Sequence, residues 1–125
     1  MVRNQVTDPL FPECPVRNIL SRVGDKWFIL VLLTLDAAKR PMRYKDIRTA
    51  IPDISQKMLS ITLQELEADG LVCRIAYAEI PPRVEYQMTE RSNSLMPHIN
   101  SLVGWALDNL SGIIRDRKAY HKQEE

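Results

Sequence analysis

Residues 55–72 read SQKMLSITLQELEADGLV, and this stretch decides the fold because it predicts one helix with a defined start and end. Ser55 is a favourable N-cap, since its hydroxyl can accept a hydrogen bond from an otherwise unpaired amide of the first turn. Gly70 tolerates the left-handed backbone at which many helices stop. Leucines that recur at i, i+4 and i+7 predict the buried stripe, which consists of Leu59, Leu63 and Leu66.

The opposite side of this predicted helix is asymmetric in charge. Its N-terminal half carries mostly small, polar or basic side chains, and its C-terminal half carries acids. These are Lys57, Ser60, Ile61 and Gln64, followed by Glu65, Glu67 and Asp69. A helix that reads DNA bases with its first turns, and keeps acids away from phosphates, has this arrangement. The alternative is an amphipathic core helix whose polar face is solvated.

The distribution of charge favours nucleic acid more than the total does. The chain has 125 residues, 45% of them apolar, which predicts one domain with a real core, and its formal net charge is only +1. Between Lys39 and Lys57, however, six bases and two acids give a local charge of +4, against −3 for the remainder. Such a basic patch is typical of a nucleic-acid-binding surface. The alternative is an ordinary solvated face.

Several classes of protein are not expected. The polar, proline-containing N-terminus has no secretory signal, and the longest apolar run, residues 27–33, is too short to span a membrane. Cys14 and Cys73 make neither a disulfide framework nor a zinc-ligand pattern. We therefore expect a cytoplasmic protein without membrane contact or cofactor. With no glycine-rich phosphate loop and only two histidines, we do not expect an enzyme.

The residues before the central stretch predict a helix-turn-helix. Residues 1–13 lack periodicity and are expected to form a flexible arm, and Pro15 opens a short helix. Residues 26–35 predict a second helix, whose continuous apolar run implies burial on nearly all sides; a buried strand is the alternative. A very short strand at residues 42–43 precedes a third helix of about two turns, at residues 44–51. This helix, a tight turn and the helix at residue 55 form the motif.

The pattern changes to period two after Gly70. One alternating run is Leu71, Cys73 and Ile75, and a second is Val84, Tyr86 and Met88. They predict a β-hairpin whose tip spans residues 77–82, and they place Cys73 in the core. A hairpin directly after a helix-turn-helix is the layout of a winged helix. The predicted fold class is mainly α with a small β-hairpin wing.

Residues 95–114 predict a long helix with an unusually broad apolar arc. We infer that part of this arc packs on a second copy of the chain; the alternative is a single thick core helix. The charged residues 115–125 are expected to form a frayed tail. The predicted organisation is thus an N-terminal arm, a domain at residues 14–114 that binds DNA and dimerises, and the tail.

Several blocks of sequence resemble a known family. They are Cys14-Pro15-Val16, Gly24-Asp25-Lys26-Trp27, Ile54-Ser55-Gln56-Lys57-Met58-Leu59, residues 63–72, and Pro81-Pro82-Arg83-Val84-Glu85-Tyr86 followed by Thr89-Glu90. In this order they resemble the HxlR-type bacterial transcriptional regulators, which are relatives of the MarR-type winged-helix proteins. The chain departs from the family's usual residues at Lys45, where a small capping residue is common, and at Asp25, where glycine is common.

The resemblance implies a homodimer that binds a palindromic operator, with one winged helix per half-site. The matching recognition helix is residues 55–69 and the matching wing is residues 77–86. The resemblance also implies that the N-terminal and C-terminal helices supply the dimer interface. The candidates there are Val16, Ile19, Leu20, Leu95, Ile99, Leu102, Val103, Ala106 and Leu110.

The candidate DNA contacts divide by chemistry. Cations neutralise phosphates and make binding salt-dependent, and the phosphate candidates are Arg43, Lys45, Arg48 and Lys57. Amides and hydroxyls can read base edges, and the candidates on or beside the helix start are Ser55, Gln56, Ser60 and Gln64. Arg83 in the wing is expected to enter the adjacent minor groove or to contact a phosphate.

Cys14 is a candidate redox sensor. It lies at the start of a predicted helix, three residues before Arg17, and both features favour the thiolate. The resemblance adds that a cysteine here is common and that some members use it to sense oxidants or electrophiles. The alternative is an ordinary thiol, and a bridge between Cys14 and Cys73 stays open.

Two other functions are compatible with the residues. One is a dimeric protein-interaction module that does not bind DNA, although it gives no reason for the basic patch. The other is a regulator that answers an unknown small molecule at the dimer interface.

Overall fold

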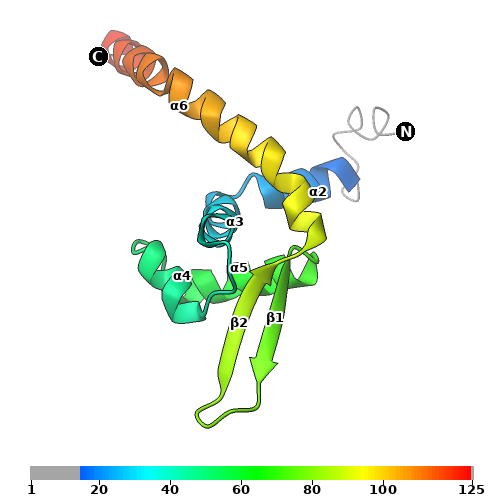
Figure 1. Cartoon of the computed structure of the whole chain (residues 1–125). Helices are drawn as coiled ribbons and strands as arrows, with labels where there is room; N and C mark the ends of the chain where they lie inside the picture. The colour runs from blue at the N-terminus through cyan, green and yellow to red at the C-terminus, as the bar shows by residue number, and fades with distance from the viewer. Residues whose placement is uncertain (1–14, 125) are drawn as a thin grey trace.

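The computed structural model describes residues 15–124, which form five helices and one two-stranded hairpin (Figure 1). The elements are α2 (Pro15–Val23), α3 (Lys26–Ala38), α4 (Tyr44–Ala50), α5 (Gln56–Ala68), β1 (Val72–Tyr77), β2 (Arg83–Met88) and α6 (Glu90–Glu124). This order confirms the predicted winged helix-turn-helix. No helix among these residues is long and apolar enough to cross a bilayer.

Helix α3 is the central helix of the core. It begins at an Asp25 N-cap, whose Oδ1 accepts hydrogen bonds from the amides of Trp27 at 2.8 Å and Phe28 at 3.2 Å. It runs beyond the predicted end near residue 35 and stops where Lys39 adopts the left-handed conformation, at φ 57°. The prediction of burial on nearly all sides is wrong, because Leu30 is 37% exposed. The buried side is Phe28, Val31, Leu32 and Leu35.

Helices α4 and α5 form the helix-turn-helix as predicted. The Oγ of Ser55 accepts a hydrogen bond from the Met58 amide at 3.0 Å, which caps α5. Gly70 follows α5 with φ +72°. The start of α4 is held by Asp46, whose carboxylate accepts a hydrogen bond from the Arg43 amide at 3.2 Å, so α4 begins before Lys45 without a small capping residue there. The leucine stripe of α5 is buried against the core, as predicted.

The hairpin is antiparallel, with Val72 opposite Met88 and Tyr77 opposite Arg83. The predicted short strand is a single bridge, in which Met42 and Tyr86 exchange two backbone hydrogen bonds of 2.8 Å. The prediction that Cys73 lies in the core is wrong, because Cys73 is exposed. Leu71 and Val72 are both buried where the chain leaves the body, and the hairpin then projects away from it (Figure 1).

Helix α6 is longer than predicted at both ends. It begins at Glu90, where Thr89 Oγ1 accepts from the Ser92 amide at 3.3 Å and Ser92 Oγ accepts from the Thr89 amide at 2.9 Å. It continues through Glu124, so the predicted helix end near Ile114 is wrong. The physical reason is that residues 115–124 contain neither glycine nor proline to stop it.

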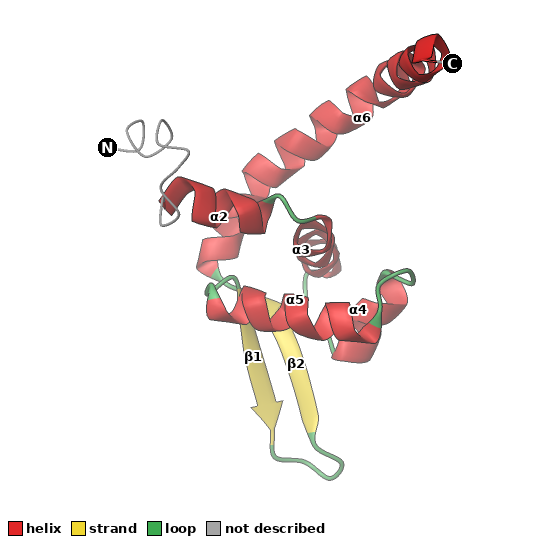
Figure 2. Ribbon diagram, turned by 180° about the vertical axis from the view of Figure 1, so that it is seen from behind, coloured by secondary structure: helices red, strands yellow, loops and turns green. Residues whose placement is uncertain are grey.

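Only the first part of α6 belongs to the core. Met96 and Ile99 are 4% and 2% exposed, and the rest of the helix extends away from the body (Figure 1). Seen from behind, α5 lies across the base of the hairpin, which points away from α2 and α6 (Figure 2). The fold therefore separates a wing and helix-turn-helix end from an end formed by α2 and α6.

Candidate nucleic-acid interface

The solvent side of α5 carries the predicted base-reading residues. Gln56, Lys57 and Gln64 are exposed, and Ser60 is half-buried. Positions 56, 60 and 64 are four residues apart, so they lie along one face of the helix. Tyr44 donates a hydrogen bond from its hydroxyl to the backbone oxygen of Gln56 at 2.9 Å, which fixes α4 beside the start of α5. The Ser55 hydroxyl is already engaged as the N-cap.

Four cations on the helix-turn-helix, at the start of α4, along α4 and in the first turn of α5, have no ion-pair partner among the described residues. They are Arg43, Lys45, Arg48 and Lys57, all exposed, and none forms an ion pair with the described residues 15–124. Lys45 and Arg48 also line a shallow hollow of about 350 Å³ on α4. A negatively charged partner meets these cations without first displacing a protein carboxylate.

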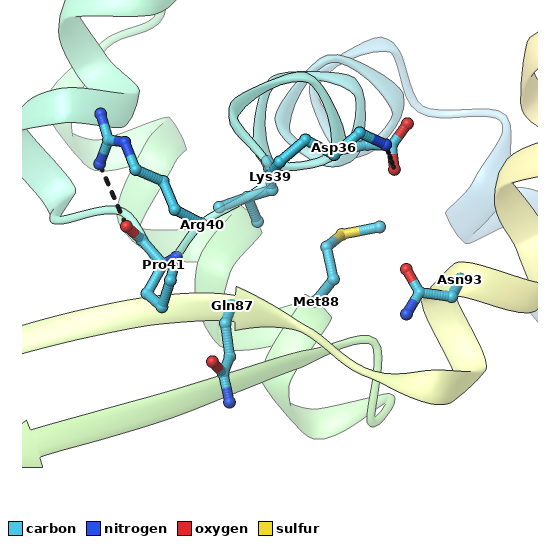
Figure 3. A pocket seen from close by; sticks show the side chains of 8 residues that line it. Asp36, Lys39, Arg40, Pro41, Gln87, Met88 and Asn93 are labelled. Carbon is cyan, nitrogen blue, oxygen red and sulfur yellow. Dashed lines mark hydrogen bonds and ion pairs between the residues drawn. The ribbon is translucent and has the colours of Figure 1, made fainter.

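The other two bases of the patch are engaged within the chain (Figure 3). Lys39 Nζ lies 3.6 Å from Asp36 Oδ1, and Arg40 Nη1 donates to the Pro41 carbonyl at 3.2 Å. Arg40 Nη1 also lies 4.0 Å from Asp46 Oδ2. Lys39 and Arg40 also line a small pocket of about 270 Å³. Of the six bases in the patch, the four named above are those without a carboxylate partner among the described residues.

Arg83 is held by its own hairpin. Its Nη2 lies 3.2 Å from Glu79 Oε1 and its Nε lies 3.8 Å from Glu85 Oε2. Its guanidinium carbon is 4.0 Å from the centre of the Tyr77 ring, and its side chain is only 28% exposed. At the wing tip, Ile80 is fully exposed. Contact of Arg83 with DNA stays a prediction. In such a contact, a phosphate or base would replace Glu79 and Glu85 as partners of the guanidinium group.

Only one of the two cysteines, Cys73, lies within residues 15–124. Cys14 lies outside the described residues, so its reactivity and a bridge to Cys73 stay predictions. Cys73 is exposed on β1 and forms no disulfide with any residue of the described part. Among the described residues there is no cluster of metal-ligating side chains.

Exposed apolar side chains gather on α2 and α6. Ile19 and Leu20 are each 59% exposed, while Leu102 is 54% and Leu110 is 50% exposed. Ala106 is exposed, Leu95 and Val103 are half-buried, and the side chain of Val16 lies outside the described part.

One residue of the predicted dimer surface is buried, and one exposed apolar residue of α6 was not among the candidates. Ile99 is 2% exposed and packs in the core of its own chain, so the prediction that placed it in a dimer interface is wrong. Trp105 was not among the candidates for this surface, although it is 58% exposed. Its spacing of three residues from Leu102 is the signal that could have identified it.

Comparison with known proteins identifies the family. The family described as "HxlR-like helix-turn-helix" matches residues 22–113. An HTH-type transcriptional regulator of Methanothermobacter thermautotrophicus is 45% identical over 92 residues, which cover 74% of this chain and 69% of that protein.

Solved structures agree with this match. The transcriptional regulator YtfH from Salmonella typhimurium has a TM-score of 0.75 at 34% identity, covering 87% of this chain and 96% of that one. The redox regulator HypR in its reduced form has a TM-score of 0.70 at 36% identity, covering 81% of this chain and 98% of that one. The chain therefore belongs to the HxlR-like helix-turn-helix family and is a transcriptional regulator, not an enzyme.

Proposed function

We propose that this regulator binds operator DNA sequence-specifically, with α5 in the major groove. The observation that carries the proposal is the set of four cations on the helix-turn-helix that form no ion pair among the described residues. Phosphate contacts from these cations position a protein on the duplex, whereas side chains at base edges select the sequence. Gln56 and Gln64, exposed along one face of α5, have the amides that can pair with adenine.

The proposed binding unit is a homodimer on a palindromic site. The exposed apolar side chains of α2 and α6 lie at the end of the molecule opposite the wing (Figure 1). A two-fold axis at that end leaves both recognition helices free for DNA. Half-sites about one helical turn apart, roughly 10 bp, suit such a dimer.

The test is a salt titration of binding to the DNA upstream of the protein's own gene. We expect a protected, two-fold symmetric footprint. Lys57→Ala and Arg48→Ala should each lower affinity and reduce the slope of log affinity against log salt by about 1 per lost phosphate contact. Lys122→Ala, an exposed base at the far end of α6, is the matched control and should leave both unchanged.

Equal slopes for all three variants and the wild type would remove this surface from the DNA interface. Smeared, salt-sensitive protection without symmetry would favour a module that acts through a protein partner.

A redox response through Cys14 is a second proposal, favoured by the likeness to the redox regulator HypR. Mild oxidation should change the footprint of the wild type and of Cys73→Ser, but not of Cys14→Ser. If Cys14→Ser responds to the oxidant like the wild type, Cys14 is not the sensor.

A further inference from the structure

The C-terminal end of α5 concentrates negative charge. Glu65, Glu67 and Asp69 lie there, and α5 has no basic residue in its last turn. The helix dipole adds a partial negative charge at the same end. This end of the recognition helix therefore depends on cations from other parts of the chain.

The first such cation comes from α2. Arg22 Nη1 lies 3.4 Å from Asp69 Oδ2 and 3.7 Å from Glu65 Oε2. That nitrogen is shielded from solvent, although the side chain as a whole is 35% exposed. The helix pattern alone suggests that these acids form a solvated face. Instead, Glu65 and Asp69 share a cation from α2.

The second cation comes from the start of α6. Arg91 Nη1 donates a hydrogen bond to the backbone oxygen of Asp69 at 2.8 Å. Beside it, Thr89 Oγ1 donates to the backbone oxygen of Gly70 at 2.7 Å. The last turn of the recognition helix is consequently held from α2 on one side and from the start of α6 on the other.

The three helices also border a cavity next to these contacts. A cavity of about 590 Å³ lies among α2, the end of α5 and the first turns of α6, and it is lined by Arg22, Asp69 and Arg91. Next to this cavity, Arg22 and Arg91 are the residues whose polar side-chain contacts reach Asp69 from α2 and from α6.

We infer that Arg22 and Arg91 are positioning residues that set the direction of the recognition helix relative to α2 and α6. The inference rests on the proposed dimeric DNA binding, because α2 and α6 are the helices that a second copy would contact. In the dimer, this connection fixes the separation of the two recognition helices, and hence the half-site spacing that the protein accepts.

The test compares Arg22→Gln and Arg91→Gln with Arg117→Gln, an exposed arginine on α6 that forms no ion pair among the described residues. Each protein is titrated with its operator, with operators whose half-sites are moved by one or two base pairs, and with a single half-site. We expect Arg22→Gln to lose about three- to tenfold affinity for the operator and to discriminate less between spacings. Single half-site binding should stay unchanged.

A double-mutant cycle identifies the contact itself. Arg22→Gln with Asp69→Asn should lose no more operator affinity than either single variant, because both remove the same pair. Additive losses would show that Arg22 acts elsewhere.

Hydrogen exchange at the amides of residues 66–70, measured without DNA, separates this inference from the proposed function. We expect faster exchange in Arg22→Gln and Arg91→Gln than in Arg117→Gln. Unchanged exchange overturns the anchor whether or not the protein binds DNA. Faster exchange with unaltered spacing preference overturns the positioning role. If the wild type binds no operator, the proposed function is refuted. Faster exchange in the two variants would then still show that Arg22 and Arg91 stabilise the end of α5, but not that they position it on DNA.

Discussion

Gly70 shows how a single residue ends the recognition helix. Its φ of +72° lies in the region that side chains with a Cβ rarely adopt, and a Cβ there would lie 2.5 Å from Arg91 Nη1. The residue therefore serves two requirements, the left-handed backbone and the close approach of Arg91. The glycine was predictable from sequence, whereas the approach of Arg91 was not, because 21 positions separate the two residues.

Gly70→Ala should lower the free energy of unfolding by about 1–2 kcal/mol, since the left-handed conformation is strained for alanine. Gly104→Ala is the matched control, because nothing lies within 4 Å of a Cβ at that helical position. It should be neutral or stabilising by up to about 1 kcal/mol. Urea unfolding measures the free energy of unfolding of both variants. Equal changes in the two would show that the left-handed backbone at Gly70 does not require glycine.

Helix α5 as an element depends on its first turn. The Ser55 Oγ satisfies the Met58 amide, and Tyr44 binds the backbone of Gln56 beside it. The start of the recognition helix is thus fixed both by its own cap and by α4. This arrangement holds Gln56 and Lys57 at the exposed end where DNA contact is proposed.

Ser55→Ala should cost about 1 kcal/mol of unfolding free energy, because the Met58 amide loses its hydrogen-bond acceptor. Ser101→Ala, an exposed position on α6 without a side-chain hydrogen bond among the described residues, should change stability by no more than about 0.5 kcal/mol. The urea midpoints of the two variants, compared at an unchanged dependence of unfolding free energy on urea concentration, measure both effects. A loss at Ser101 as large as that at Ser55 would show that the cap is not the cause.

The molecule as a whole has two ends with different surfaces. The helix-turn-helix carries exposed cations that form no ion pair among residues 15–124, and α2 with α6 carries exposed apolar side chains. Helix α6 has 35 residues, about 50 Å at 1.5 Å per residue, and most of it extends beyond the core. In a single copy of the chain, this helix leaves Leu102, Trp105 and Leu110 exposed to water, which is typical of a surface that binds another protein.

In the proposed homodimer, Leu102→Gln with Leu110→Gln should raise the dissociation constant at least about tenfold, because each leucine that becomes buried contributes about 1.5–3 kcal/mol and a two-fold axis counts each one twice. Sedimentation velocity across micromolar concentrations measures the change. Ile80→Gln, at the fully exposed wing tip, is the control and should leave dimerisation unchanged. An unaltered sedimentation profile for the double variant would place any dimer contact elsewhere.

By itself, the sequence determined where α3, α4 and α5 begin and how the hairpin follows them. These features depend on caps, glycines and apolar periodicity, which act within one or two helical turns or one strand pair. Asp25, Ser55 and Gly70 are examples, because each acts on its immediate neighbours in the chain. The basic patch was also visible, since its residues are close together in sequence.

Only the tertiary structure decided which charges are free and which apolar residues are covered. Arg40 and Arg83 lie beside carboxylates, whereas Arg48 and Lys57 have no carboxylate partner within the described part of the chain. Ile99 is buried, while Leu102 is exposed. The physical reason is that ion pairing and burial depend on which segments meet in space. Arg22 reaches Asp69 only because α2 returns to the end of α5, and no local pattern in either helix contains that contact.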